Sequence, residues 1–171
     1  MGYRCLALDQ STQILGWCLM VDGFPEKRGS IDFSKCKSTV EKINECRKSI
    51  ELLIKMTQCE IITIEDIQAQ INQQTFKTLA ELKGVIENLI FDKGFLYFIL
   101  SPSEWRSIIG LKPKSRKRED CKIAAIEFVK DNFDLNLEED SDCAEAICIA
   151  YATNKKYVSQ IVVKVDEDLF S

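Results

Sequence analysis

Histidine is absent from this sequence, and glycine and proline are scarce, with 7 and 3 of 171 residues. Without histidine, a Ser-His-Asp triad, a Cys-His dyad and an imidazole metal ligand are all excluded. The low glycine and proline content excludes collagen-like and linker-rich architectures. Any catalysis must therefore depend on carboxylates, lysines, cysteines or a bound ion.

Long apolar runs are also absent. No stretch approaches the roughly 18 apolar residues that a membrane span requires. The first residues, MGYRCLALDQ, lack the apolar core of a signal peptide. We therefore expect a cytoplasmic protein that does not associate with membranes.

The eight cysteines include no CxxC pair. Structural zinc sites commonly use such pairs, often together with histidine, so this spacing argues against one. Free thiols in a reducing compartment are the simpler interpretation, because cysteine within an apolar run behaves as a small hydrophobic residue.

The length of 171 residues and the hydrophobic content of 46% fit one domain with a sizeable core. We expect residues 1–171 to form a single domain, and we assign no role to the tail from about residue 157. The net charge of −4 argues against a general coat for nucleic acid, but it is compatible with a local basic patch.

The pattern of apolar residues predicts an α/β fold. Compact apolar runs predict strands at residues 3–8, 15–21, 27–33, 60–64 and 95–100. Helical spacing predicts helices at residues 38–57, 75–91, 119–129 and 137–151, and Ser101 followed by Pro102 marks the start of another. This order indicates a mixed sheet, with an antiparallel meander first and helices packed on the sheet.

Four acidic residues stand where predicted elements begin or end. Asp9 closes the first strand and Glu65 closes the fourth, while Asp142 and Glu145 lie three residues apart near the start of the last helix. Such positions can converge on one cleft of an α/β sheet. Clustered carboxylates repel one another unless a cation neutralises them, and oxygen ligands alone select Mg²⁺ or Mn²⁺. Taken singly, Asp9 or Glu65 is more often a solvated loop or cap residue, and Asp142 could simply cap the last helix, so the indication comes from their joint placement.

Two polar segments are candidates for binding nucleic acid. The run KPKSRKR is basic at Lys112, Lys114, Arg116, Lys117 and Arg118. Local basic clusters of this kind bind phosphodiester backbones, although a solvated loop has the same composition. The amide-rich segment after the fourth strand adds Gln68, Gln70 and Asn72.

Three stretches of the sequence, LALDQSTQILGW, IITIED and DCAEAICIA, together resemble the RuvC family of Holliday-junction resolvases over residues 3–152. The resemblance implies an RNase H-like fold, a mixed five-stranded sheet flanked by helices. It also implies an Mg²⁺-dependent endodeoxyribonuclease with two ions per site, in which Mn²⁺ substitutes for Mg²⁺. Asp9, Glu65, Asp142 and Glu145 would be its catalytic, metal-binding acids.

The activity implied is resolution of four-way DNA junctions by paired symmetric nicks that leave 5′-phosphate and 3′-hydroxyl ends. The partner would be branched DNA, bound by a homodimer formed through the helix at residues 75–91. The apolar face of that helix has an alternative interpretation as ordinary core. The basic groups that steady the phosphate would lie among Lys112, Lys114, Lys117 and Arg118.

The sequence departs from the family pattern at two places. Glu145 stands where the family usually has an aspartate, and Asp140 is a lower-ranked substitute for a neighbouring ligand. Gln68 stands where the family has a wedge aromatic, so opening of the junction by an inserted ring is not implied. Ile71 and Phe76 are the fallback candidates for that role.

Three other functions fit parts of the pattern. A broader nuclease for forks and flaps would share the same active site. A non-catalytic junction-binding protein would keep the basic segment without binding metal. The polar residues after Asp9, with Gly16 beyond them, also resemble the phosphate loop of actin-like ATPases and sugar kinases, which need a second lobe that this length does not supply.

Overall fold

A computed structural model describes residues 3–68 and 72–158. Its five strands are β1 (Arg4–Asp9), β2 (Ile14–Val21), β3 (Phe24–Asp32), β4 (Ile61–Glu65) and β5 (Leu96–Leu100), in the sheet order β3-β2-β1-β4-β5. Strands β3, β2 and β1 pair antiparallel, whereas β1, β4 and β5 pair parallel. The mixed five-stranded sheet and its antiparallel meander are therefore confirmed.

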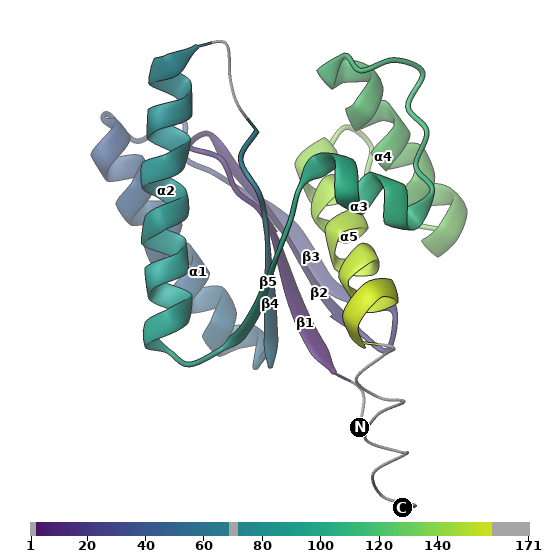
Figure 1. The fold of residues 1–171 in the computed structure, drawn as a ribbon, viewed down its shortest axis with the longest axis horizontal. Helices are drawn as coiled ribbons and strands as arrows, with labels where there is room; N and C mark the ends of the chain where they lie inside the picture. The colour runs from purple at the N-terminus through teal and green to yellow at the C-terminus, as the bar shows by residue number, and fades with distance from the viewer. Residues whose placement is uncertain (1–2, 69–71, 159–171) are drawn as a thin grey trace, which may run out of the picture.

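Helices cover both faces of this sheet (Figure 1). They are α1 (Thr39–Thr57), α2 (Gln73–Asp92), α3 (Pro102–Ile109), α4 (Arg118–Phe133) and α5 (Ser141–Thr153), and a short π-helical turn η1 (Asn154–Val158) follows. Helices α1 and α2 lie on one face, while α3, α4 and α5 lie on the other. The flanking helices predicted from the sequence are thus confirmed.

Alternation along the strands assigns side chains to these two faces. On β1, Leu6 and Leu8 join the core beneath α1 and α2, and Ala7 joins the core beneath α5. Because successive side chains of a strand point to opposite faces, Asp9 lies on the α5 side with Ala7. Glu65, which follows the buried Thr63 by two residues on β4, lies on that side for the same reason.

Helix caps set the starts of α1 and α3 where the sequence predicts them. The Ser38 hydroxyl accepts a hydrogen bond from the Glu41 amide, and the Ser101 hydroxyl accepts one from the Glu104 amide. Proline follows Ser101 in the first turn of α3, where its missing N–H costs no helical hydrogen bond.

Three predicted boundaries are wrong by three or four residues, each for a local reason. The helix predicted at residues 119–129 continues to Phe133 and ends where Asp134 takes a positive φ of 54°. The last helix begins at Ser141 and not at residue 137, because the Asp140 carboxylate caps it by accepting the Cys143 amide at 3.0 Å. The third strand begins at Phe24, because Asp22 and Gly23 both take positive φ, at 51° and 81°, and close a tight hairpin.

The apolar stripe of α2 belongs to the core. Leu82, Ile86, Leu89 and Ile90 are buried in the cluster that includes α1 and the sheet. This finding supports the alternative interpretation of that face as ordinary core. Among the large apolar residues of α2, those left exposed are Phe76 and Phe91, near its two ends. The homodimer stays a prediction.

The cysteines behave as the sequence analysis expects. All eight are free thiols, and all except Cys36 are buried. Over residues 3–68 and 72–158, no helix is both long enough and apolar enough to cross a membrane.

Candidate active site

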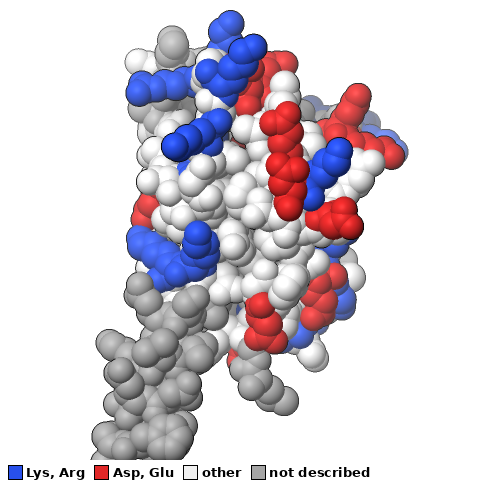
Figure 2. Space-filling view, turned by 90° about the vertical axis from the view of Figure 1, so that its right-hand side faces the viewer, with Lys and Arg blue, Asp and Glu red and all other residues white. Residues whose placement is uncertain are grey.

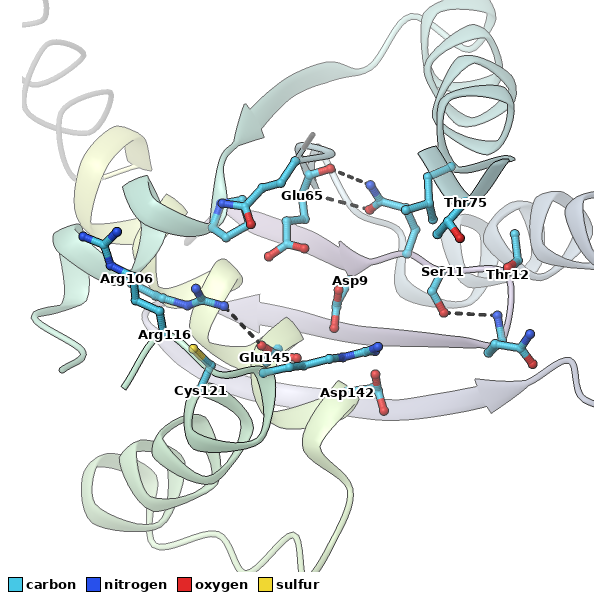
Figure 3. A pocket seen from close by; sticks show the side chains of 16 residues that line it. Asp9, Ser11, Thr12, Glu65, Thr75, Arg106, Arg116, Cys121, Asp142 and Glu145 are labelled. Atoms are coloured by element: carbon cyan, nitrogen blue, oxygen red, sulfur yellow. Dashed lines mark hydrogen bonds and ion pairs between the residues drawn. The ribbon is translucent and has the colours of Figure 1, made fainter. Parts of the chain in front are cut away.

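The four predicted acids line one pocket of about 460 Å³. Asp9 and Glu65 come from the ends of the neighbouring parallel strands β1 and β4, and Asp142 and Glu145 come from the first turns of α5. Figure 3 shows the four side chains around one common space. The ends of parallel strands meet at one edge of a sheet, so the convergence expected from the sequence is present.

Three of the acids form the tightest group. Asp9, Asp142 and Glu145 each offer one carboxylate oxygen, and these oxygens all lie within 4.8 Å of one another. Glu65 lines the same pocket but is not part of this group. The glutamate at position 145 therefore reaches the cluster, whereas Asp140 is used as a helix cap.

Burial and mutual repulsion disfavour the charged forms of these acids. Burial, together with the charges of Glu65, Glu145 and Asp142, holds the pKa of Asp9 well above its usual range, and Lys122 only partly offsets this. Burial also raises the pKa of Glu65 to about 7. The pKa of Glu145 is raised by burial against the opposing effect of Lys122. Within the pocket, the carboxylates therefore destabilise one another's charged forms.

Two basic side chains that were not among the sequence-based candidates offset part of this repulsion. Lys122 of α4 places its Nζ 3.3 Å from Asp142 Oδ1, and Arg106 of α3 places a guanidinium nitrogen 3.6 Å from Glu145 Oε1. Lys122 lies one helical turn after Arg118, which indicates a shared face. Arg106 lies outside the basic run, in the stretch SPSEWRSIIGL, and was not singled out there.

The donor set fits a hard divalent cation. Among the described residues, the group consists of carboxylate oxygens from Asp9, Asp142 and Glu145, with Glu65 nearby. Cys121 also lines the pocket, but it is not part of the group. Mg²⁺ and Mn²⁺ favour such oxygen ligands. A bound cation would also relieve the repulsion that raises the pKa of Asp9.

The basic segment divides into a part that faces the pocket and a part that does not. Arg116 and Arg118 line the pocket with the acids. Lys112, Lys114 and Lys117 are exposed but do not line it. Figure 2 views the α3 and α4 side of the molecule, where Lys and Arg lie mostly to the left and Asp and Glu mostly to the right. Arg116 was a candidate for binding DNA, but it was not among the residues expected to steady the phosphate.

The amide-rich segment contributes less than expected within the described residues. Gln68 lines the pocket. Asn72 caps α2, and its Oδ1 accepts hydrogen bonds from the amides of Gln74 and Thr75. Gln70 and Ile71 lie outside the described residues.

Two further residues contact the site and were missed. The Gln10 side chain bonds the main chain of Glu65, and the indole of Trp105 donates to the Glu65 carboxylate. Gln10 directly follows Asp9, which was a usable signal. Trp105 gave none, because a tryptophan in a short helix is usually a core residue, and this one is also fully buried.

No protein-family model matches the sequence, and no curated protein matches it. Among solved structures, the RuvC structure of Thermus thermophilus superposes with a TM-score of 0.70 at 12% identity, covering 93% of this chain and 96% of that one. The yeast mitochondrial Holliday junction resolvase Ydc2 gives 0.58 at 12% identity over 96% and 84%. The Fowlpox virus resolvase, solved with Holliday junction DNA, gives 0.59 at 8% identity over 93% and 99%. The chain therefore has the RNase H-like fold of RuvC and other Holliday junction resolvases.

Proposed function

We propose that this protein is a divalent-metal-dependent endodeoxyribonuclease that resolves four-way DNA junctions by paired symmetric nicks. The observation that carries this proposal is the convergence of Asp9, Glu65, Asp142 and Glu145 on one pocket with arginines at its rim. Its fold supports the proposal, because solved structures of T. thermophilus RuvC and Fowlpox virus resolvase with this fold contain Holliday junction DNA.

The acids would hold the metal, in the proposal two Mg²⁺ ions per site with Mn²⁺ as a substitute. Asp9, Asp142 and Glu145 would supply ligands to one position, and Glu65 with Asp9 would supply ligands to the other. Bound there, divalent ions would supply Lewis acidity for the attacking water and for the leaving 3′-oxygen.

The basic residues would bind and orient the DNA. Arg116 and Arg118, at the rim, would pair with phosphates and so place the scissile bond against the acids. Arg106 lines the same pocket, with a guanidinium nitrogen 3.6 Å from Glu145 Oε1. Together with Lys122 it would offset negative charge that develops during cleavage. The products would carry 5′-phosphate and 3′-hydroxyl ends.

Paired nicks need two sites related by two-fold symmetry, so the proposal includes a homodimer. Helix α2 is the candidate interface, through its exposed Phe76 and Phe91 and not through its buried stripe. Sedimentation velocity would measure whether the protein is a monomer or a dimer. A protein that stays monomeric both alone and on a four-way junction would contradict the symmetric mechanism.

Cleavage of synthetic DNA tests the proposal. A labelled four-way junction, a fork and a linear duplex are incubated with the protein and Mg²⁺, and the cut positions are mapped on both strands. Asp9→Asn removes the central acid, and Asp131→Asn, an exposed acid of α4 outside the pocket, is the matched control.

We expect symmetric nicks in the junction that are lost with Asp9→Asn and kept with Asp131→Asn. Equal cutting of forks would widen the activity to a branched-DNA nuclease. Tight junction binding without cleavage in Mg²⁺ or Mn²⁺ would contradict the enzymatic proposal and indicate a binding protein.

A further inference from the structure

Glu65 is the acid of the site that other side chains hold most firmly. Its carboxylate oxygen Oε1 accepts a hydrogen bond of 2.8 Å from the indole Nε1 of Trp105 in α3. Trp105 has no exposed surface, and a buried indole N–H must find an acceptor. The indole and the carboxylate therefore fix each other, and Glu65 keeps a defined direction into the pocket.

Gln10 holds the main chain of the same residue. The Gln10 amide donates from Nε2 to the Glu65 carbonyl at 2.5 Å, and its Oε1 accepts from the Glu65 amide at 3.3 Å. Main-chain pairing between β1 and β4 ends at Leu8 and Ile64. The Gln10 side chain thus supplies two hydrogen bonds between the strands just beyond the point where their main chains stop pairing.

These contacts set where two acids stand relative to each other. Gln10 follows Asp9 directly, so its two hydrogen bonds tie the end of β1 to the end of β4. Gln10 is itself buried, with 8% of its surface exposed, which limits the freedom of this link. Neither Gln10 nor Trp105 bears a charge, so neither of them neutralises the acids.

We propose that Gln10 and Trp105 are positioning residues that hold Glu65 at a fixed place beside Asp9 so that it can bind a divalent cation. The inference rests on the proposed function to the extent that Glu65 is a metal ligand. Loss of such supporting hydrogen bonds typically lowers metal affinity by about 10-fold to 100-fold. We expect Trp105→Phe and Gln10→Met each to weaken Mg²⁺ binding within that range.

Mg²⁺ titrations of the full chain by calorimetry test this without an activity assay. Trp105→Phe keeps an aromatic ring and removes the N–H donor. Trp17→Phe, at the only other tryptophan of the sequence, is the matched control because Trp17 does not line the pocket. Thermal unfolding without metal is measured for every variant, so that lower affinity can be separated from lower stability.

The indole resonances of the wild-type protein give a second readout that needs no folded variant at Trp105. In ¹H–¹⁵N spectra, Mg²⁺ should shift the Trp105 indole signal and leave that of Trp17 in place, and Glu65→Gln should abolish the shift. Gln10→Met should reduce Mg²⁺ affinity even if Trp105→Phe does not fold.

The outcomes separate the two proposals. Normal Mg²⁺ affinity in Trp105→Phe and Gln10→Met, with weakened binding in Glu65→Gln, would overturn the positioning role and leave the metal site intact. A Trp105 indole signal that ignores Mg²⁺ while the wild-type protein binds the ion would also overturn it. A wild-type protein that binds neither Mg²⁺ nor Mn²⁺ would overturn the proposed function and this inference together.

Discussion

The two faces of the sheet are packed with side chains of different size, and only one of them carries the acids. Beneath α1 and α2 the core is made of leucines and isoleucines such as Leu6, Ile50 and Ile86. Beneath α5 it is made largely of alanines and cysteines such as Ala146 and Cys148. Large side chains hold a helix away from a sheet, whereas small ones let it approach closely.

The close approach of α5 is visible at Gly16 of β2. A Cβ atom at this position would lie 2.1 Å from the main-chain oxygen of Asp142. Gly16 also pairs with Asp9 in the β1–β2 ladder. The small residues therefore bring the start of α5 directly over the strand end that bears Asp9, and the contrast between the faces explains why the acids meet on this one.

The largest effect is expected where this approach is blocked. Gly16→Ala places a methyl group against the Asp142 carbonyl, so α5 must move away from the sheet. We expect a loss of about 3 kcal/mol in the free energy of unfolding, measured by urea denaturation. Displacement of a catalytic group by about 1 Å can cost about 100-fold in rate, and we expect junction cleavage to fall by at least that much.

Gly84→Ala on α2 is the matched control on the other face. Gly84 is exposed within a helix, and its added Cβ would meet no atom within 4 Å. Alanine is the better helix former, so the variant should gain about 0.5–1 kcal/mol and keep full cleavage. Normal cleavage in Gly16→Ala would show that the close approach of α5 does not position the acids.

Mg²⁺ should stabilise the protein through the acid-bearing face, and more at high pH than at low pH. Because the pKa of Glu65 is about 7 in the folded protein and about 4.5 ordinarily, the folded state binds more protons between these values. Stability without metal should therefore fall as pH rises from about 4.5 to about 7. A cation at 100 times its Kd adds about 2.7 kcal/mol, and it binds the deprotonated acids.

Thermal unfolding at pH 5 and pH 8, with and without Mg²⁺, measures both effects. Equal stabilisation by Mg²⁺ at the two pH values would contradict an origin in the raised pKa of Glu65. Asp131→Asn should behave as the wild-type protein in this comparison, since Asp131 lies outside the pocket.

Asp9→Asn should make the metal-free protein more stable although it abolishes cleavage. The substitution removes a charge that burial and three neighbouring acids disfavour. We expect a gain of about 0.5–2 kcal/mol at pH 8 without metal, against a change within about 0.5 kcal/mol for Asp131→Asn. Unfolding in urea checks this, and a loss of stability in Asp9→Asn would mean that the pocket is not strained by its charge.

The sheet and most helices follow from local patterns, and one boundary error involves a side chain from a distant strand. The strand that ends at Asp9 is readable from its apolar run. The start of α5 is not, because Asp140 caps the helix and is itself held by the Ser30 hydroxyl at 2.9 Å from β3. That contact joins residues 110 positions apart, which no local pattern reveals.

The residues of the candidate site also divide into those that the sequence predicts and those that it does not. The acids were identifiable because each stands at the end of an element with a clear apolar pattern. Arg106 and Trp105 were not, because whether a residue of α3 faces the acids depends on how that helix packs on the sheet. The polarity pattern of the sequence does not reveal that the N–H of a buried tryptophan donates a hydrogen bond to a carboxylate.

The smallest effect comes from one substitution made on both faces. Ile86 of α2 and Ile147 of α5 are both fully buried, and each change to valine should cost about 1 kcal/mol in the free energy of unfolding. Ile86→Val should leave cleavage and Mg²⁺ affinity unchanged, because its neighbours bear no acid of the site. Ile147→Val loosens the helix that carries Asp142 and Glu145. Cleavage should therefore fall several-fold in this variant, although its loss of stability equals that of Ile86→Val. If both variants lost cleavage equally, overall stability and not the packing of α5 would set the geometry of the acids.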